Sequence, residues 1–147
     1  ILDLGCGLNP IFCSKPGVFY YAADISEENL LIVSKFFSKN KIEGRTFVYD
    51  LQDSSNELPK VDICLIFKVF DIIEDKGHKK AEAVIDKVNA ENIIISFSTI
   101  KLSGRLMHQP RRLWLEKLLK RKAYSYILKN IGNELFYIIN KNNFIKA

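Results

Sequence analysis

Short apolar segments alternate along the chain with segments in which apolar residues recur at helical spacing. The apolar segments are nearly continuous, as in parallel strands buried on both faces, and they predict strands at residues 1–4, 18–23, 45–49, 62–67, 92–97 and 135–139. The remaining pattern predicts helices at 27–39 and 78–89, a basic amphipathic helix or helix pair at 110–130, and a short loop or helix at 11–17. This alternation indicates an α/β fold with a Rossmann-like, doubly wound and mostly parallel sheet, in which the partner of the last strand stays open.

The first expected strand ends in the turn Asp3-Leu4-Gly5-Cys6-Gly7, and the second ends at another acid, Asp24. The two glycines allow a sharp turn and leave no Cβ between the backbone and a ligand. Asp24 follows about 20 residues later, where nucleotide-binding α/β folds place the acid that holds the ribose hydroxyls. A D-x-G-x-G turn followed by such an acid resembles the S-adenosylmethionine (SAM) site of class I methyltransferases.

Two other interpretations of this glycine turn stay open. A dinucleotide site shares the architecture, but its fingerprint has a third glycine three residues after the second, and Pro10 occupies that place. The turn could also join a strand to a helix in an α/β protein that holds no cofactor. SAM is favoured because Asp3 stands just before the turn, where SAM enzymes direct a carboxylate towards the amino end of the methionine.

Length and composition narrow the class of protein. A chain of 147 residues with 48% hydrophobic and 27% charged residues is typical of one soluble globular domain. No apolar run approaches the roughly 20 residues that cross a bilayer, and no secretory signal is visible, so a cytoplasmic location is expected. Three scattered cysteines, Cys6, Cys13 and Cys64, indicate neither a disulfide framework nor a zinc site. Because the chain starts directly on its first strand without Met, we expect residues 1–147 to be a catalytic domain without its N-terminal extension.

The net charge of +5 is unevenly distributed along the chain. Residues 101–129 carry +8, because nine basic residues face the single acid Glu116, and the remainder of the chain carries −3. The basic residues are Lys101, Arg105, Arg111, Arg112, Lys117, Lys120, Arg121, Lys122 and Lys129. A solvated helix face is one explanation of such a run, but its segregation favours contact with RNA or DNA.

Several blocks narrow the family further, at residues 66–74, 95–99, 104–107, 114–116 and 133–139. With the opening residues 5–10, they occur in the order and near spacing of the aminoglycoside-resistance 16S rRNA (guanine-N7) methyltransferases, which the chain resembles from residue 1 to about residue 140. The resemblance implies a SAM-dependent enzyme with the 30S ribosomal subunit and its 16S rRNA as partner. It also implies antibiotic resistance, a monomer, and neither a membrane nor a metal partner.

The resemblance assigns roles to particular residues at the ends of the expected strands. The residues expected to contact SAM are Asp3, Gly5, Gly7, Asn9, Asp24, Ile25, Asp50, Leu51 and Phe67. Among them, Asp24 would hold the ribose hydroxyls and Asp50 the adenine amine. Lys68 would stand beside the methyl group as the catalytic residue. The residues expected to contact the flipped guanine and its backbone are Ser96, Arg105, Met107, Arg111 and Arg112.

The chemistry of the target atom agrees with this resemblance. Enzymes that methylate exocyclic amines use an Asn/Asp-Pro-Pro-aromatic turn after the fourth strand, where this chain has Phe67-Lys68-Val69-Phe70. None of the three cysteines follows a proline, as the nucleophile for carbon-5 methylation commonly does. Guanine N7 carries a free lone pair and no proton, so its methylation needs orientation rather than a general base. We therefore interpret Lys68 as a group that positions the base through its O6 or a phosphate.

Departures from the family pattern lie on the substrate side. Ser98 stands where the family usually has proline, the loop after Arg105 is two residues shorter, and Arg111 replaces an aromatic residue. These differences leave the SAM turn unchanged but put the target nucleotide in doubt. A small-molecule methyltransferase and a non-catalytic rRNA-binding protein with a SAM fold therefore stay open as alternatives.

Overall fold

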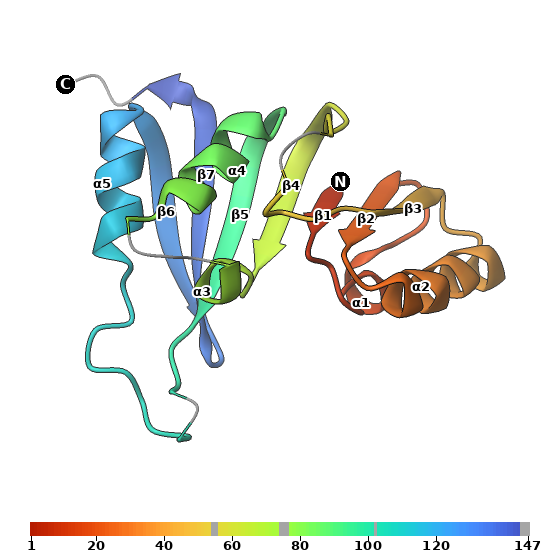
Figure 1. The fold of residues 1–147 in the computed structure, drawn as a ribbon, viewed down its shortest axis with the longest axis horizontal. Coiled ribbons are helices and arrows are strands. Elements are labelled where there is room, and N and C mark those ends of the chain that lie inside the picture. Colours follow the sequence, from red (N-terminus) through yellow and green to blue (C-terminus); the bar gives the residue numbers. More distant parts are fainter. Residues whose placement is uncertain (54–55, 74–76, 102, 145–147) are drawn as a thin grey trace.

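The computed structural model describes residues 1–53, 56–73, 77–101 and 103–144, with Glu74 of the family blocks outside them. Its centre is one seven-stranded sheet with helices packed against it (Figure 1). The strands are β1 (Leu2–Leu4), β2 (Tyr20–Asp24), β3 (Gly44–Val48), β4 (Val61–Phe67), β5 (Ala90–Ser98), β6 (Tyr124–Ile131) and β7 (Glu134–Phe144). The helices are α1 (Pro10–Cys13), α2 (Glu27–Asn40), α3 (Phe70–Ile73), α4 (Lys79–Lys87) and α5 (Leu113–Arg121).

The strand order is β3-β2-β1-β4-β5-β7-β6. The first five strands are parallel, and β7 lies antiparallel between β5 and β6. The chain moves outwards from β1 to β3 and then returns to the other side of β1 with β4, so the order reverses between β1 and β4. In open α/β sheets, ligands bind outside the carboxyl ends of the strands at such a reversal. Those ends lie along the lower edge of the sheet in Figure 1.

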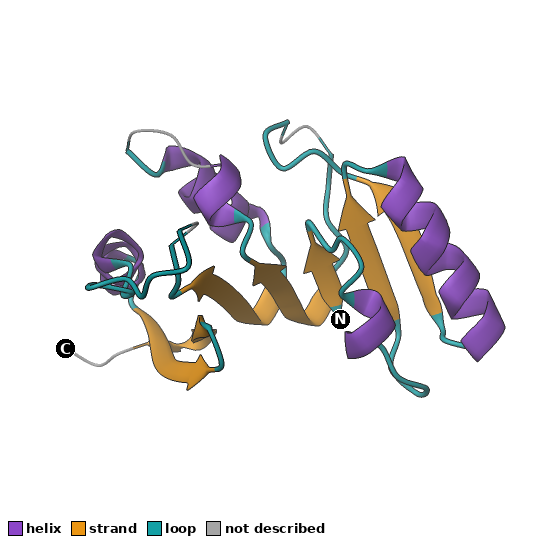
Figure 2. Cartoon of the chain, turned by 90° about the horizontal axis from the view of Figure 1, so that it is seen from below, coloured by secondary structure: helices purple, strands orange, loops and turns teal. Residues whose placement is uncertain are grey.

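Side chains on the two faces of the sheet enter separate hydrophobic cores. On β4, Leu65 packs with α2, whereas its neighbours Cys64 and Ile66 pack with α4 and α5 on the opposite face. Successive strand residues point to opposite faces, so a continuous apolar strand supplies both cores at once. Figure 2 shows helices on both faces of the sheet. The doubly wound architecture predicted from the apolar segments is therefore confirmed.

Helix α2 forms where its capping residues predict it. The hydroxyl oxygen of Ser26 accepts a hydrogen bond from the backbone N–H of Asn29 at 3.3 Å, and two acids, Glu27 and Glu28, occupy the first turn. Both features stabilise the positive end of a helix. The helix ends where Lys41 takes a left-handed conformation, with φ of +53°. This helix anchors one end of the carboxyl edge, because it begins directly after β2.

The sequence did not predict the short helix α3, and its largest error concerns residues 110–130. The predicted helix at 110–130 is a helix only as far as Arg121, and the chain then forms strand β6. Tyr124, Tyr126 and Ile127 are residue types that favour strands, and Gly132, with φ of +56°, makes a tight turn into β7. The sequence pattern did not indicate this change from helix to strand, because basic residues continue at helical spacing. The hairpin also shows the place of the last strand, β7, whose partners are β5 and β6.

Candidate functional site

The glycine turn after β1 touches the segment after β4. Gly5 and Gly7 both have positive φ, +64° and +50°. A Cβ at Gly5 would lie 2.6 Å from Cγ2 of Val69, so any side chain there would push this contact apart. A Cβ at Gly7 would meet no atom within 4 Å. The turn therefore closes tightly against the sheet on one side and leaves open space for a ligand at Gly7.

Asp24 holds this turn in place from the end of β2. Its carboxylate accepts hydrogen bonds from the backbone N–H groups of Gly7 at 2.7 Å and Ser26 at 2.8 Å. Only 8% of the residue is exposed. Each carboxylate oxygen has a second lone pair, so Asp24 can bind a ligand hydroxyl while it keeps both backbone contacts.

Asp3 is a fully buried carboxylate with one oxygen in use. Oδ2 accepts a hydrogen bond from the hydroxyl of Tyr20 at 2.9 Å, and Oδ1 has no partner among the residues that the structure describes. Burial raises the pKa of Asp3 to about 7, and the charge of Asp24 adds to this, while the Tyr20 hydrogen bond opposes it. A buried polar atom without a partner costs free energy. A cationic group beside Oδ1 would supply that partner.

Two residues predicted to contact the adenine end of SAM follow β3 at the same edge of the sheet. In the turn after this strand, Oδ1 of Asp50 accepts a hydrogen bond from the backbone N–H of Gln52 at 2.8 Å. The next residue, Leu51, is half-buried against the core. The strand is held to its neighbour because the N–H of Tyr49 donates to the carbonyl of Asp24 at 2.9 Å.

Three further predicted cofactor residues lie around this edge with different exposure. Ile25 is 65% exposed directly after Asp24. Asn9 is half-buried at the start of α1. Phe67 ends β4 and meets Phe136 edge to face, with 5.6 Å between the ring centroids. The structure thus brings the predicted cofactor residues to the carboxyl ends of the first four strands.

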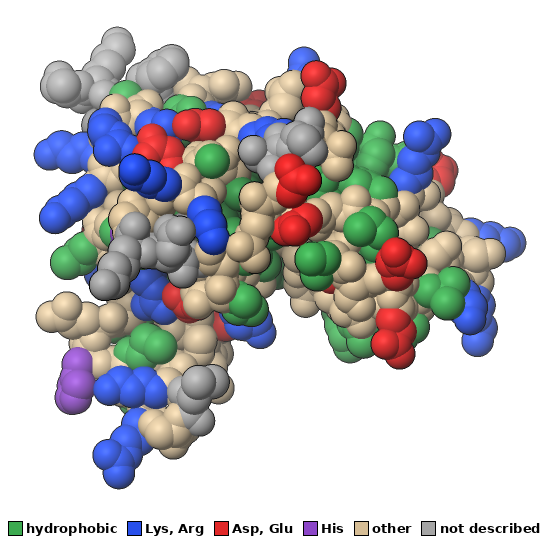
Figure 3. Space-filling model, in the orientation of Figure 1, with side chains coloured by type: hydrophobic (Ala, Val, Ile, Leu, Met, Phe, Trp, Pro, Cys, Tyr) green, Lys and Arg blue, Asp and Glu red, His purple; other side chains and the backbone are tan. Residues whose placement is uncertain are grey.

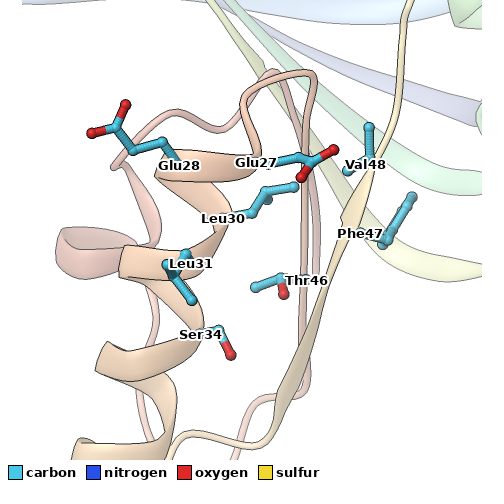
Figure 4. Close-up of a pocket in the computed structure, with 8 residues that line it drawn as sticks. All are labelled: Glu27, Glu28, Leu30, Leu31, Ser34, Thr46, Phe47 and Val48. Carbon is cyan, nitrogen blue, oxygen red and sulfur yellow. The ribbon is translucent and has the colours of Figure 1, made fainter.

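A groove of about 590 Å³ lies away from this turn, between α2 and β3 (Figure 4). Leu30, Leu31 and Phe47 line the groove, and so do Glu27 and Glu28 from the first turn of α2. None of the predicted cofactor residues takes part in this lining. Its volume therefore does not make it the candidate site, which rests on the glycine turn and its two acids.

Lys68, Ser96 and Glu134 form a connected polar group beside the turn. The ammonium of Lys68 lies 3.0 Å from Oε1 of Glu134, and the hydroxyl of Ser96 donates to Oε2 at 2.7 Å. The sequence predicted Lys68 and Ser96 but not Glu134 as a functional residue. Pairing the Gly132 hairpin with β5 would have found it, because Glu134 lies opposite Ser98 in the register.

Residues after β5 double back as a small hairpin that carries two predicted RNA contacts. The N–H of Met107 donates to the carbonyl of Thr99, and the N–H of Lys101 donates to that of Arg105, both at 2.8 Å. Arg105 is exposed and Met107 is half-buried. The segment projects below the carboxyl edge in Figure 1, beyond the ends of β4 and β5.

The other two predicted RNA contacts are tied into the fold. Arg111 makes two hydrogen bonds to Glu116, at 2.8 and 2.5 Å, and this contact holds the pKa of the Glu116 carboxyl below its usual range. Arg112 is only 14% exposed and lies 3.0 Å from Asp71, with its guanidinium 4.8 Å from the ring centre of Phe97. Sequence reasoning missed the role of Arg112 because Asp71 lies 41 residues away in the chain, and it missed the Arg111–Glu116 pair although Glu116 is only five residues away. The contact of Arg111 and Arg112 with RNA stays a prediction.

Replacing Arg112 by alanine is expected to lower the free energy of unfolding by about 2 kcal/mol, because it removes a mostly covered guanidinium from its ion pair with the partly exposed Asp71 and from its stacking on Phe97. Urea denaturation measures the change. Arg105→Ala is the matched control, since this arginine is exposed and forms no ion pair with any described residue. Equal stability of the two variants would contradict the structural role of Arg112.

The remaining basic residues of the 101–129 segment divide into two groups. Arg121 and Lys122 pair with Glu82, and Lys122 also pairs with Asp86. The others form no ion pair within the described part of the chain: Lys101, Arg105, Lys117, Lys120 and Lys129. In Figure 3, Lys and Arg side chains gather over α5 and on the segment that projects below the sheet. This surface borders the carboxyl edge on the β5 side.

In the described ranges, no cluster of three or more His, Cys, Asp or Glu side chains is arranged to hold a metal ion. No helix within those ranges combines the length and apolar character needed to cross a bilayer.

Comparison with known proteins decides the family. The model of the family "Ribosomal RNA methyltransferase (FmrO)" matches residues 1–138. The chain belongs to this family. Two relatives named 16S rRNA (guanine(1405)-N(7))-methyltransferase resemble the chain: the one from Micromonospora echinospora is 30% identical over 145 residues, and the one from Serratia marcescens is 30% identical over 147 residues. These matches cover 95% and 97% of this chain but 53% and 57% of the relatives, so the chain spans about half of their length.

Solved structures agree with the FmrO assignment. The structure of the 16S rRNA methylase RmtB superposes with a TM-score of 0.78 at 25% identity, covering 96% of this chain and 55% of that one. The methyltransferase RmtF in complex with S-adenosyl-L-homocysteine has the same TM-score at 24% identity, covering 95% and 54%. The fold and the family predicted from the glycine turn and the ordered blocks are confirmed.

Proposed function

We propose that this chain is a SAM-dependent methyltransferase that acts on N7 of a guanine in 16S rRNA. The observation that carries the proposal is the unpartnered, buried Oδ1 of Asp3, which lies on β1 just before the glycine turn whose Gly7 N–H the carboxylate of Asp24 holds. Relatives of this chain are named for methylation of guanine 1405 at N7. We extend that activity to this chain, whose residues 1–147 form the catalytic domain.

The residues at the glycine turn fit SAM. The ammonium of its methionine part would give Oδ1 of Asp3 the cationic partner that it lacks, and the ribose hydroxyls would donate to Asp24. Gly7 leaves room for the backbone to approach the ligand. Asp50 and Leu51 would flank the adenine. SAM supplies an electrophilic methyl group on a positively charged sulfur.

The chain's own contribution to catalysis is orientation. The lone pair of guanine N7 is the nucleophile and no proton leaves the base, so no side chain has to act as a general base. The base must leave its stack to reach the site. The hairpin carrying Arg105 and Met107 follows β5, to whose end Lys68 is tied through the carbonyl of Ser96, and these three residues would hold the base and its backbone. Alignment of this kind supplies a large part of a rate enhancement.

The basic surface supports an rRNA substrate and makes a prediction. Reversal of two exposed lysines of α5, Lys117→Glu with Lys120→Glu, is expected to weaken binding to 30S subunits at least tenfold near 0.1 M salt. It should also make the slope of log affinity against log salt concentration shallower by about two, since each lysine contact with phosphate releases about one counterion. Filter binding at several salt concentrations measures both.

The matched control reverses two exposed lysines of α2, at the other end of the sheet. Lys35→Glu with Lys39→Glu changes the net charge equally, and α2, which carries both lysines, lies far from α5 in Figure 1. An equal loss of affinity in the two double variants would show a general charge effect and contradict a docking surface on α5.

Transfer of methyl label from SAM to unmodified 30S subunits tests the proposed function. We expect label in the RNA fraction with the wild-type chain and none with Asp24→Ala. If the wild-type chain binds SAM but labels only low-molecular-weight compounds of an added cell extract, the rRNA substrate is wrong. If it binds SAM and labels neither, the enzymatic activity is wrong.

A further inference from the structure

We propose that Glu134 is a positioning residue that holds the ammonium of Lys68 in place and cancels its charge. This inference rests on the proposed function, because it assigns to Glu134 a part in a reaction that moves positive charge across the site. Glu134 begins β7, on the antiparallel hairpin, and reaches the carboxyl edge of the parallel strands from there.

The backbone at Lys68 directs its side chain towards Glu134. Lys68 has a φ of +58°, a conformation that residues other than glycine rarely adopt. It persists because the N–H of Lys68 donates to the carbonyl of Ser96 at 3.0 Å, which ties the residue after β4 to the end of β5. A strained residue that its surroundings hold in place is a feature of functional sites. Here the strain aims a lysine across the end of β5.

The carboxylate of Glu134 is itself fixed at both oxygens. Oε2 accepts the hydrogen bond from Ser96, which is fully buried, and Oε1 lies 3.0 Å from the Lys68 ammonium. The Lys68 side chain is 55% exposed and the Glu134 side chain 25% exposed. The pair therefore has a rigid acid on an anchored strand and a lysine that solvent or a ligand can still reach.

Charge explains why this lysine needs an acid. As the lone pair of N7 forms the new bond to the methyl carbon, the carbon–sulfur bond breaks and its electron pair stays on sulfur. The sulfur becomes neutral and the base gains the positive charge. An isolated ammonium would oppose a cation at either place, whereas a neutral Lys68–Glu134 pair does not. In a partly exposed site, where the effective dielectric constant lies between that of a surface pair and that of bulk water, one such charge changes an affinity by roughly threefold or more.

The test compares SAM with S-adenosylhomocysteine, which has the same groups but a neutral sulfur. Isothermal titration gives the ratio of their dissociation constants for the wild type, Glu134→Gln, Lys68→Met and the double variant. We expect Glu134→Gln to raise the ratio of the SAM dissociation constant to the S-adenosylhomocysteine dissociation constant about threefold. Lys68→Met should lower this ratio about threefold. The double variant should return to the wild-type ratio, because its pair is again neutral. A structural defect in a variant would instead weaken the binding of both ligands by the same factor.

The controls separate this inference from the proposed function. Lys39→Met, which removes an exposed lysine from α2, should leave the ratio unchanged. Equal ratios in all four proteins, with both ligands bound normally, would overturn the role of Glu134 and leave the proposed function standing. A shifted ratio without methyl transfer to 30S subunits would support Glu134 and contradict the proposed substrate. Failure of the wild type to bind SAM would overturn both.

Discussion

Replacing Asp24 by alanine is expected to weaken SAM binding about 100-fold. The carboxylate has two roles at once, since it fixes the Gly7 N–H at 2.7 Å and would accept the ribose hydroxyls. Hydrogen bonds to a charged group are worth about 1.5–3 kcal/mol each, and two such bonds correspond to a factor of about 100 or more in the dissociation constant. Isothermal titration measures the change directly.

The matched control for Asp24 is Asp50→Ala, which removes an acid from the next turn along the same edge. Its carboxylate accepts one backbone hydrogen bond, from Gln52, so we expect a loss of only about tenfold. Because Asp24→Ala also frees the N–H groups of Gly7 and Ser26, urea denaturation should accompany the titration and correct for any unfolded fraction. A dissociation constant unchanged in folded Asp24→Ala would refute the cofactor site.

The affinity for SAM is expected to rise about tenfold between pH 5.5 and pH 7. The pKa of Asp3 is about 7, against an ordinary value of 3.8, because burial disfavours its charged form. At pH 5.5 nearly all of Asp3 is protonated and does not attract the ammonium, whereas at pH 7 about half is ionised. The α-amino group of the ligand stays mostly protonated over this range. Titrations at four pH values measure the trend.

The same shift predicts the opposite trend in the stability of the protein without ligand. Because the folded state binds the Asp3 proton more tightly than the unfolded chain, this group's contribution is complete below pH 3.8 and is lost as the pH rises through about 7. SAM should therefore raise the melting temperature more at pH 7 than at pH 5.5. In Asp3→Asn, which keeps the size of the side chain, binding should be weak and independent of pH. A flat wild-type profile would contradict the assigned ammonium contact.

Features that depend on neighbouring residues could be predicted from the sequence. The glycine turn needs backbone conformations that glycine adopts readily, and Asp24 follows at the spacing of a βαβ unit. The start of α2 is marked by Ser26, Glu27 and Glu28 within one turn. The site's cofactor half was therefore largely present in the sequence, because one short stretch of chain builds it.

Features that depend on long-range contacts could not be predicted. Arg112 contacts Asp71, 41 residues away, and Glu134 contacts Ser96, 38 residues away. Nothing in the local pattern distinguishes these residues from surface charges, so the sequence indicated neither the ion pair of Arg112 with Asp71 nor the position of Glu134 beside Ser96. The prediction of a helix as far as residue 130 was wrong for a related reason, because β6 forms a strand by pairing with β7. The substrate half of the site is assembled by the fold.

Identification of the methylated nucleoside tests the central claim most directly. Unmodified 30S subunits are incubated with the chain and methyl-labelled SAM, and the 16S rRNA is then digested to nucleosides and separated. We predict that the label elutes as 7-methylguanosine, with no label when Asp24→Ala replaces the wild-type chain. Label in any other nucleoside, or unlabelled rRNA from a chain that binds SAM, would contradict the account.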